Sequence, residues 1–158
     1  MDINYIAFFL IAFVPLILGY FWYNPKRPNI IRVGISGIEN FTILKKIFFF
    51  LASLSIIYVY MNLVIHQLGF YELFFTDIML GSESAQQIVD EFMASYGGKH
   101  RHLGHGLLHG ALNAVLLWIP VIGSYCIMTN KSWLHFKVHF IYALGTTVIV
   151  SGLIAAFV

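Results

Sequence analysis

Four long apolar stretches constrain the fold of this 158-residue chain more than any other feature of its sequence. They cover approximately residues 4–23, 47–67, 103–128 and 133–158. A helix rises about 1.5 Å per residue, so each stretch can cross a hydrocarbon core about 30 Å thick. Only 10% of the residues are charged, against about a quarter in a soluble domain. We therefore predict a single all-α membrane domain, residues 1–158, with four transmembrane helices in a bundle.

The longest connection, residues 68–102, contains one segment with helical periodicity. Ser84 and Gln87 have the spacing of a capping box, in which two side chains bond backbone N–H groups at the start of a helix. The apolar side chains that follow recur on one helical face. We predict a short amphipathic helix over residues 84–96, lying on the bilayer or capping the bundle. Residues 69–80 are apolar enough to lie at the membrane interface.

Lysine and arginine are distributed unevenly among the connections. They are Lys26, Arg27, Arg32, Lys45 and Lys46 in the first, Lys99 and Arg101 in the second, and Lys131 and Lys137 in the third. The second connection also carries five acids. Because cytoplasmic loops are enriched in lysine and arginine, we predict that both termini and the 68–102 loop are external. The expected location is the bacterial cytoplasmic (inner) membrane, with the first apolar stretch retained as a helix because it lacks signal-peptide features.

Residues 97–113 hold four of the seven histidines and lead into the third apolar stretch. Side chains three or four positions apart share one face of a helix. The residues with this spacing are His102, His105, His109 and Asn113. We therefore predict a polar face at the start of the third helix.

The second apolar stretch ends with a similar polar pair, Asn62 and His66, four residues apart. A polar group that faces lipid without a partner costs roughly 1–3 kcal/mol. The polar faces of the second and third helices should therefore meet. We predict that these helices are neighbours and that His66 lies within reach of His105 or His109.

These histidines have more than one chemical interpretation. They can form a hydrogen-bonded polar cluster between helices, supported by Asn62 and Asn113. They can also bind haem or a divalent transition metal such as zinc or copper, because imidazole is a common ligand of such metals. The candidate metal ligands are His66, His102, His105 and His109. A third interpretation is a proton- or quinone-handling site.

Small residues accompany the histidines. Gly106 and Gly110 lie beside the polar face with small-xxx-small spacing, and Gly152 with Ala156 repeats this spacing in the fourth helix. Such residues let helix backbones approach closely in a membrane. We predict that Gly106 and Gly110 set a close helix contact.

Other chemistries lack their required residues. A zinc protease needs His-Glu-x-x-His, but Gly106 follows His105 and no glutamate is in place. The single cysteine, Cys126, excludes an internal disulfide and a cysteine-based zinc site. The net charge of +2 is too small to indicate a nucleic-acid partner. We expect His135 and His139 to lie at a headgroup boundary, and we expect no enzymatic activity.

Four short motifs, at residues 19–25, 64–67, 105–110 and 131–133, span nearly the whole chain. The first and third, Gly-Tyr-Phe-Trp-Tyr-Asn-Pro and His-Gly-Leu-Leu-His-Gly, resemble motifs of the domain of unknown function 1761 family of small bacterial membrane proteins. The other two resemble the segment that closes that family's second helix and its last turn. The chain departs from the family at residues 26–29, where Lys-Arg-Pro-Asn replaces a segment with an aromatic residue, Gly and Trp. The resemblance implies a four-helix membrane fold and no particular activity.

Three functions are compatible with this sequence. The small-residue faces favour a structural or accessory membrane component with an external polar cluster, acting as a homo-oligomer or within a larger membrane complex. The histidines favour a metal- or haem-binding membrane protein that uses His66, His105 and His109. A carrier is the third possibility, and four helices would have to oligomerise for that role. The lipid bilayer is the partner common to all three.

Overall fold

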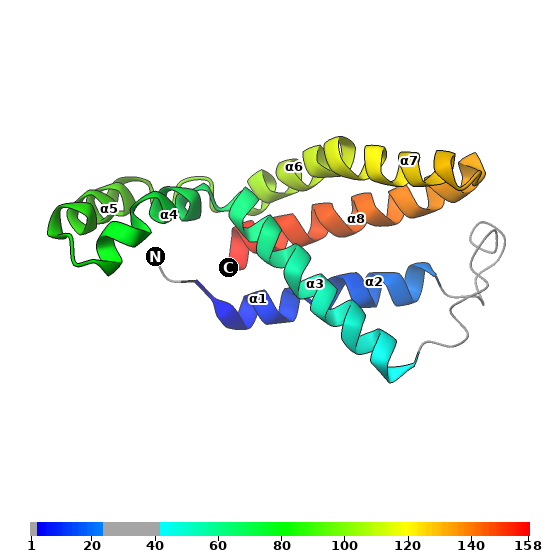
Figure 1. Ribbon diagram of the computed structural model, residues 1–158, viewed down its shortest axis with the longest axis horizontal. Helices are drawn as coiled ribbons and strands as arrows, with labels where there is room; N and C mark the ends of the chain where they lie inside the picture. Colours follow the sequence, from blue (N-terminus) through cyan, green and yellow to red (C-terminus); the bar gives the residue numbers. More distant parts are fainter. Residues whose placement is uncertain (1–2, 24–41) are drawn as a thin grey trace.

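The computed structural model describes residues 3–23 and 42–158, and all the regular elements in these ranges are helices (Figure 1). Four helical segments are long and apolar enough to cross a membrane: Tyr5–Trp22, Ile43–Val64, Leu103–Met128 and Trp133–Phe157. The prediction of an all-helical chain with four membrane-length helices is therefore confirmed. Lys26, Arg27 and Arg32, whose connection is predicted to be cytoplasmic, lie outside the described residues.

The first span is interrupted in its middle, as α1 (Tyr5–Ile11) and α2 (Val14–Trp22). The side chain of Asn4 accepts a hydrogen bond from the backbone of Ala7 at 3.1 Å and so caps α1. Pro15 has no N–H to donate to the carbonyl of Ile11 four residues earlier, and the helix is broken just before it.

The second span, α3 (Ile43–Val64), begins earlier and ends earlier than predicted. Thr42 caps its start by accepting a hydrogen bond from the backbone of Lys45. Its end is set by Ile65, whose φ of −95° and ψ of 84° are not helical. The predicted range of 47–67 is therefore wrong at both ends. His66 opens a new helix and is not on α3 with Asn62.

Residues 68–102 form more helix than predicted. After Ile65 comes α4 (His66–Met79), followed by α5 (Glu83–Tyr96), and the two pack as a helical hairpin that extends past the end of the bundle (Figure 1). Phe70 of α4 stacks on Phe92 of α5, with ring centroids 3.7 Å apart. The expected loop over 69–80 is thus incorrect, because aromatic packing against α5 keeps this segment helical.

A helix does occupy the predicted region near 84–96, but its cap differs from the prediction. Ser82 precedes α5 and accepts a hydrogen bond from the backbone of Ala85. Gly81 turns the chain with a φ of +85°, which glycine adopts without strain. The capping residue is therefore Ser82, and the predicted pair of Ser84 and Gln87 does not start the helix.

The third span combines α6 (Leu103–Asn113), a π-helical turn η2 (Ala114–Trp118) and α7 (Ile119–Met128). Pro120 cannot donate a backbone hydrogen bond to the turn before it, and a wider turn there accommodates the missing donor. The indole N–H of Trp118 donates to the hydroxyl of Tyr60 on α3, at 3.3 Å. The irregular turn thus lies beside α3, where it finds a polar partner.

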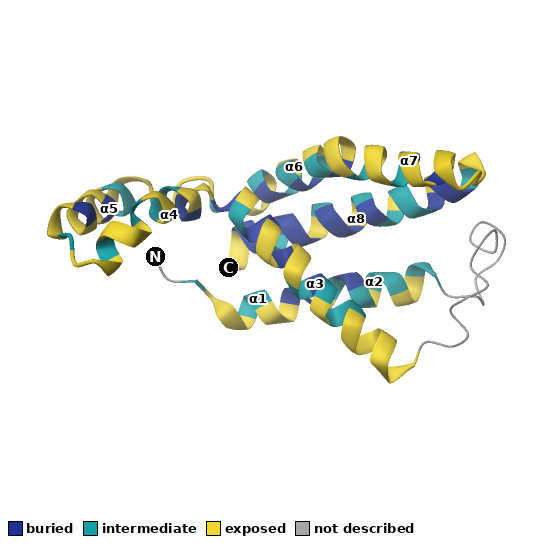
Figure 2. Ribbon diagram, in the orientation of Figure 1, coloured by how far each residue is buried: buried dark blue, intermediate teal, exposed yellow. Residues whose placement is uncertain are grey.

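The fourth span, α8 (Trp133–Phe157), is the central element of the bundle. It contacts α1, α2, α3, α6, η2 and α7, and its buried residues form the most continuous buried surface in the molecule (Figure 2). The carbonyl of Val158 accepts a hydrogen bond from the backbone of Asn4, at 3.0 Å. Both ends of the described chain therefore lie at the same end of the bundle.

Glycines on α6 bring its backbone against that of α8. A Cβ atom added to Gly106 would overlap the carbonyl of Ser151, and one added to Gly110 would lie 2.5 Å from Cα of Val148. The hydroxyl of Thr147 donates to the carbonyl of Gly110 at 3.2 Å. The two helices thus pack backbone to backbone, an arrangement that any larger residue at these glycines would prevent.

We expect Gly106→Ala and Gly110→Ala each to lower the stability of the protein by about 1–3 kcal/mol, the usual cost of overpacking. The added methyl group would force α6 away from α8. Thermal unfolding in detergent measures this loss. Gly145→Ala is the matched control, because a Cβ there meets nothing within 4 Å and alanine only raises helix propensity. Equal melting temperatures for all three variants would contradict the close contact.

Candidate functional site

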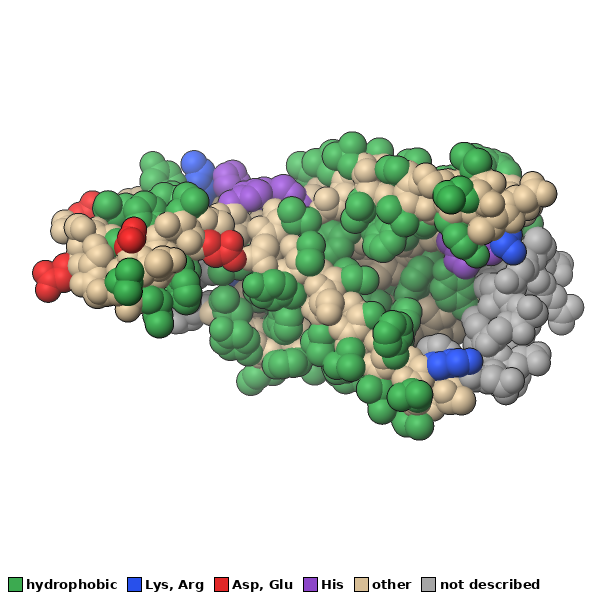
Figure 3. All heavy atoms as spheres, viewed as in Figure 1, with side chains coloured by type: hydrophobic (Ala, Val, Ile, Leu, Met, Phe, Trp, Pro, Cys, Tyr) green, Lys and Arg blue, Asp and Glu red, His purple; other side chains and the backbone are tan. Residues whose placement is uncertain are grey.

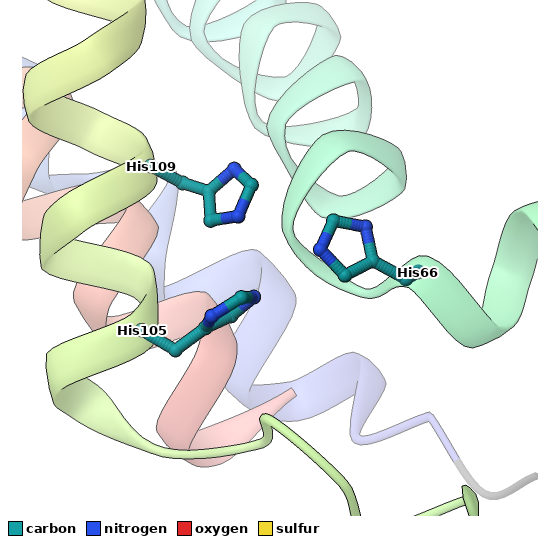
Figure 4. Close-up of side chains that lie close together, drawn as sticks. All are labelled: His66, His105 and His109. Carbon is teal, nitrogen blue, oxygen red and sulfur yellow. The ribbon is translucent and has the colours of Figure 1, made fainter.

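Three histidines gather where the end of α3 meets the start of α6. His66 is the first residue of α4, and the non-helical backbone of Ile65 redirects the chain before it. His105 and His109 lie one turn apart on α6. Figure 4 shows the three rings turned toward a common space between these elements. We call His66, His105 and His109 the histidine triad.

The triad has the compactness of a metal-binding group. The ring centroid of His66 lies 5.2 Å from that of His105 and 5.0 Å from that of His109. The ring centroids of His105 and His109 are 4.5 Å apart. One nitrogen from each ring lies within 4.8 Å of the others. Around tetrahedral zinc, with bonds of about 2.0–2.1 Å, ligand nitrogens are about 3.4 Å apart. Small side-chain rotations would close the remaining difference.

The ring nitrogens of the triad make no hydrogen bond with any described residue. Nε2 of His105 is buried in this state, whereas His66 is exposed and His109 is half-buried. A buried polar atom without a partner costs about 1–3 kcal/mol. A metal ion that accepted the lone pair of this nitrogen, or a group that formed a hydrogen bond with it, would remove that cost.

His102 has a different role from the one predicted. Its backbone is extended, with a φ of −151°, and its Nδ1 accepts a hydrogen bond from the backbone N–H of His105 at 3.2 Å. It is therefore the N-cap of α6, outside the helix, and does not share the helical face of His105 and His109. Its ring centroid lies 6.0 Å from that of His105, and it is not part of the triad.

The predicted supporting asparagines do not join the histidines. The amide of Asn62 donates to the carbonyl of Tyr58 on its own helix, at 2.9 Å. Asn113 ends α6 one turn beyond His109, and among the described residues its side chain makes no hydrogen bond with the triad. The prediction failed for Asn62 because α3 ends before His66, so the two residues no longer share a face.

Two residues near the triad were missed by the sequence analysis. His100 stacks on His105, with centroids 5.0 Å apart. Gln67 is 5% exposed and donates from Nε2 to the carbonyls of Tyr96, at 2.8 Å, and Lys99, at 2.7 Å. The crowding of histidines in residues 97–113 was a signal for His100. Gln67 belongs to the 64–67 motif, but nothing in the sequence indicated its hydrogen bonds, because its partners are backbone carbonyls distant in the chain.

A second aromatic and histidine cluster lies at the other end of the bundle. His135 and His139, on α8, have ring centroids 4.3 Å apart, and Nδ1 of His139 lies 2.9 Å from the hydroxyl of Tyr23. The hydroxyl of Tyr142 donates to the carbonyl of Pro15 at 2.7 Å. Burial, with a smaller effect of Tyr142, raises the pKa of the Tyr23 phenol, which stays neutral. These contacts fasten α2 to α8. His135 is buried, and its expected position at the headgroup boundary stays a prediction.

Comparison of the chain with protein-family models, curated proteins and solved structures finds no match. The family resemblance of the four sequence motifs therefore stays a prediction, and the site is interpreted from its own geometry.

We expect Gln67→Leu to loosen the turn between α5 and α6 while the bundle stays folded. The change removes two hydrogen bonds worth about 1–3 kcal/mol together, and 1.4 kcal/mol corresponds to a tenfold change in an opening equilibrium. Amide hydrogen exchange across residues 97–102 should therefore accelerate about tenfold or more. Gln86→Leu is the control, because among the described residues the side chain of Gln86 bonds only that of Asp90, on the surface of α5. Unchanged exchange in the Gln67 variant would contradict this anchoring.

Proposed function

We propose that this chain is a multi-pass membrane protein that binds a divalent transition metal ion through His66, His105 and His109. The observation that carries the proposal is the convergence of three imidazole nitrogens within 4.8 Å, one from α4 and two from α6. None of the three rings has a hydrogen-bond partner among the described residues, and one of the nitrogens is buried.

A purely hydrogen-bonded polar cluster accounts less well for this arrangement. Neutral imidazoles have one donor and one acceptor each, and a structural cluster would be expected to use them. Here Asn62 bonds its own helix, and the histidines face one another across a shared space (Figure 4). A metal ion would satisfy a nitrogen of each ring at once.

Zinc is the ion we expect first. Imidazole suits zinc, copper, nickel and iron, and neither thiolate nor carboxylate belongs to the group to favour another choice. No carboxylate belongs to the group to act as a general base beside a metal-bound water. We therefore propose a binding function rather than catalysis.

An accessory role in a larger complex is the second candidate that the sequence raised. Its main support was the small-residue faces of the third and fourth helices. In the structure these faces pack on each other, Gly106 against Ser151 and Gly152, and Gly110 against Thr147. They are therefore used within the chain, which leaves the histidine triad as the feature that still needs a ligand.

We propose that the triad faces the outside of the bacterial inner membrane. The triad lies at the bundle end that holds Asn4, Val158 and the α4–α5 hairpin. In Figure 3 the acidic side chains lie on this hairpin, next to the histidines and outside the apolar bundle. Lys45, Lys46 and Lys131 belong to the opposite end, and cytoplasmic ends are enriched in lysine.

Purified protein without a histidine tag should bind a single zinc ion per chain and gain stability from it. At a zinc concentration 100 times Kd, the gain is about 2.7 kcal/mol. Thermal unfolding with zinc and then with a chelator measures it. His66→Ala and His109→Ala should abolish the zinc effect, whereas Asn62→Ala, at the same end of the bundle, should retain it. If neither zinc nor the chelator changes the stability of the parent protein, the structural role is favoured instead.

The orientation is tested by single cysteines in a Cys126→Ala background. A cysteine at Glu83, at the start of α5, should react with an impermeant maleimide on intact spheroplasts. A cysteine at Lys131, between α7 and α8, should react only after lysis. Both positions are exposed, so accessibility within the fold does not decide the result. The reverse labelling pattern would place the triad on the cytoplasmic side.

A further inference from the structure

His100 lies in the turn between α5 and α6, next to the histidine triad. Its ring stacks on that of His105, with centroids 5.0 Å apart and planes inclined by 27°. The side chain is exposed, and its ring makes no hydrogen bond with any described residue. His100 is therefore an imidazole close to the triad, and its own ring nitrogens make no hydrogen bond with the described residues.

The backbone holds His100 in this place. Its φ of +65° falls in the left-handed region, which residues other than glycine adopt infrequently. The backbone N–H of His102 donates to the carbonyl of His100 at 3.0 Å. Gln67, next to His66, bonds the carbonyls of Tyr96 and Lys99 on the approach to the turn. Non-glycine residues in such conformations tend to occur at functional sites.

The neighbouring His102 is not equivalent. Its Nδ1 already accepts the backbone hydrogen bond that caps α6, and its ring lies farther from His105 than the ring of His100 does, at 6.0 Å. Moving it to a metal would uncap α6. The ring of His100 makes no hydrogen bond with the described residues that a rotation toward the triad would break.

We infer that His100 is the fourth protein ligand of the metal ion proposed above for the triad, completing a four-histidine site. The inference rests on that proposed function. His100 is outside the group of nitrogens that lie within 4.8 Å of one another, so its ring rotates from the face of His105 toward the ion when the ion binds. Four protein ligands close the coordination shell, as in structural zinc sites. Catalytic zinc sites, by contrast, keep one position open.

A closed site has a consequence for the α4–α5 hairpin. Its two ends carry His66 and the turn with His100, while His105 and His109 belong to the bundle. An ion held by all four residues therefore links both ends of the hairpin to α6. Metal binding should order residues 97–102 relative to the metal-free protein, which suits a metal-responsive membrane protein better than an enzyme.

The test compares His100→Asn with His102→Asn in full-length protein that carries no histidine tag. Asparagine tolerates a positive φ and is a good N-cap, so each variant keeps its backbone role and loses only the imidazole. Zinc affinity is measured by competition with a chromogenic chelator. Cobalt(II) replaces zinc as a spectroscopic probe, because its visible absorption reports ligand number and type.

We expect His100→Asn to weaken zinc binding about tenfold or more, since even loss of an outer-shell partner of a ligand costs roughly 10- to 100-fold. Its cobalt spectrum should become pH-dependent, because a water that can ionise takes the fourth position. His102→Asn should leave affinity and spectrum as in the parent protein. Zinc should also slow amide exchange across residues 97–102 in the parent and not in His100→Asn.

The possible failures are distinguishable. If the parent protein binds neither zinc nor cobalt, the proposed function fails and the role of His100 fails with it. If the parent binds and His100→Asn has the same affinity and spectrum, the triad stands as the metal site and His100 is not a ligand. Equal weakening in both variants would show a disturbed turn, and would also overturn ligation by His100.

Discussion

The backbone contact between α6 and α8 is the interaction on which the rest of the structure depends. In a membrane the hydrophobic effect does not drive helices together, and close packing of small residues takes its place. Gly106 and Gly110 provide that packing against the central helix. Each glycine directly follows a histidine, so the side of the helix on which the glycine lies is about 100° around the axis from the histidine side chain. The face that packs on α8 thus directs His105 and His109 away from it, toward the end of α3.

The end of α3 supplies the other half of the site. Ile65 leaves the helical conformation, and α4 begins with a different direction at His66. The histidine from the α3–α4 junction therefore reaches the two on α6. Gln67 then bonds backbone carbonyls at the far end of the hairpin. One short segment thus both places a candidate ligand and holds the returning chain near it.

Acidic residues gather at the end of the molecule that holds the triad. The hairpin that borders the triad bears most of the acids, with Lys99 and Arg101 in the turn that follows it, and the lysines of α3 and of the α7–α8 turn belong to the opposite end (Figure 3). Negative potential near an opening raises the local concentration of cations. The Tyr23, His139 and Tyr142 contacts at the other end are satisfied by hydrogen bonds and act in packing α2 on α8.

The sequence by itself determined the number of spans and the histidine spacing. Long apolar runs cannot leave a bilayer without cost, and helical periodicity places His105 beside His109 whatever surrounds them. Only the tertiary structure decided where α3 ends, because no Pro or Gly marks Ile65 and the preference for α4 comes from aromatic contacts with α5. That ending separates Asn62 from the site. Long-range contacts of this kind, which have no local signature, also decided the position of the turn that carries His100.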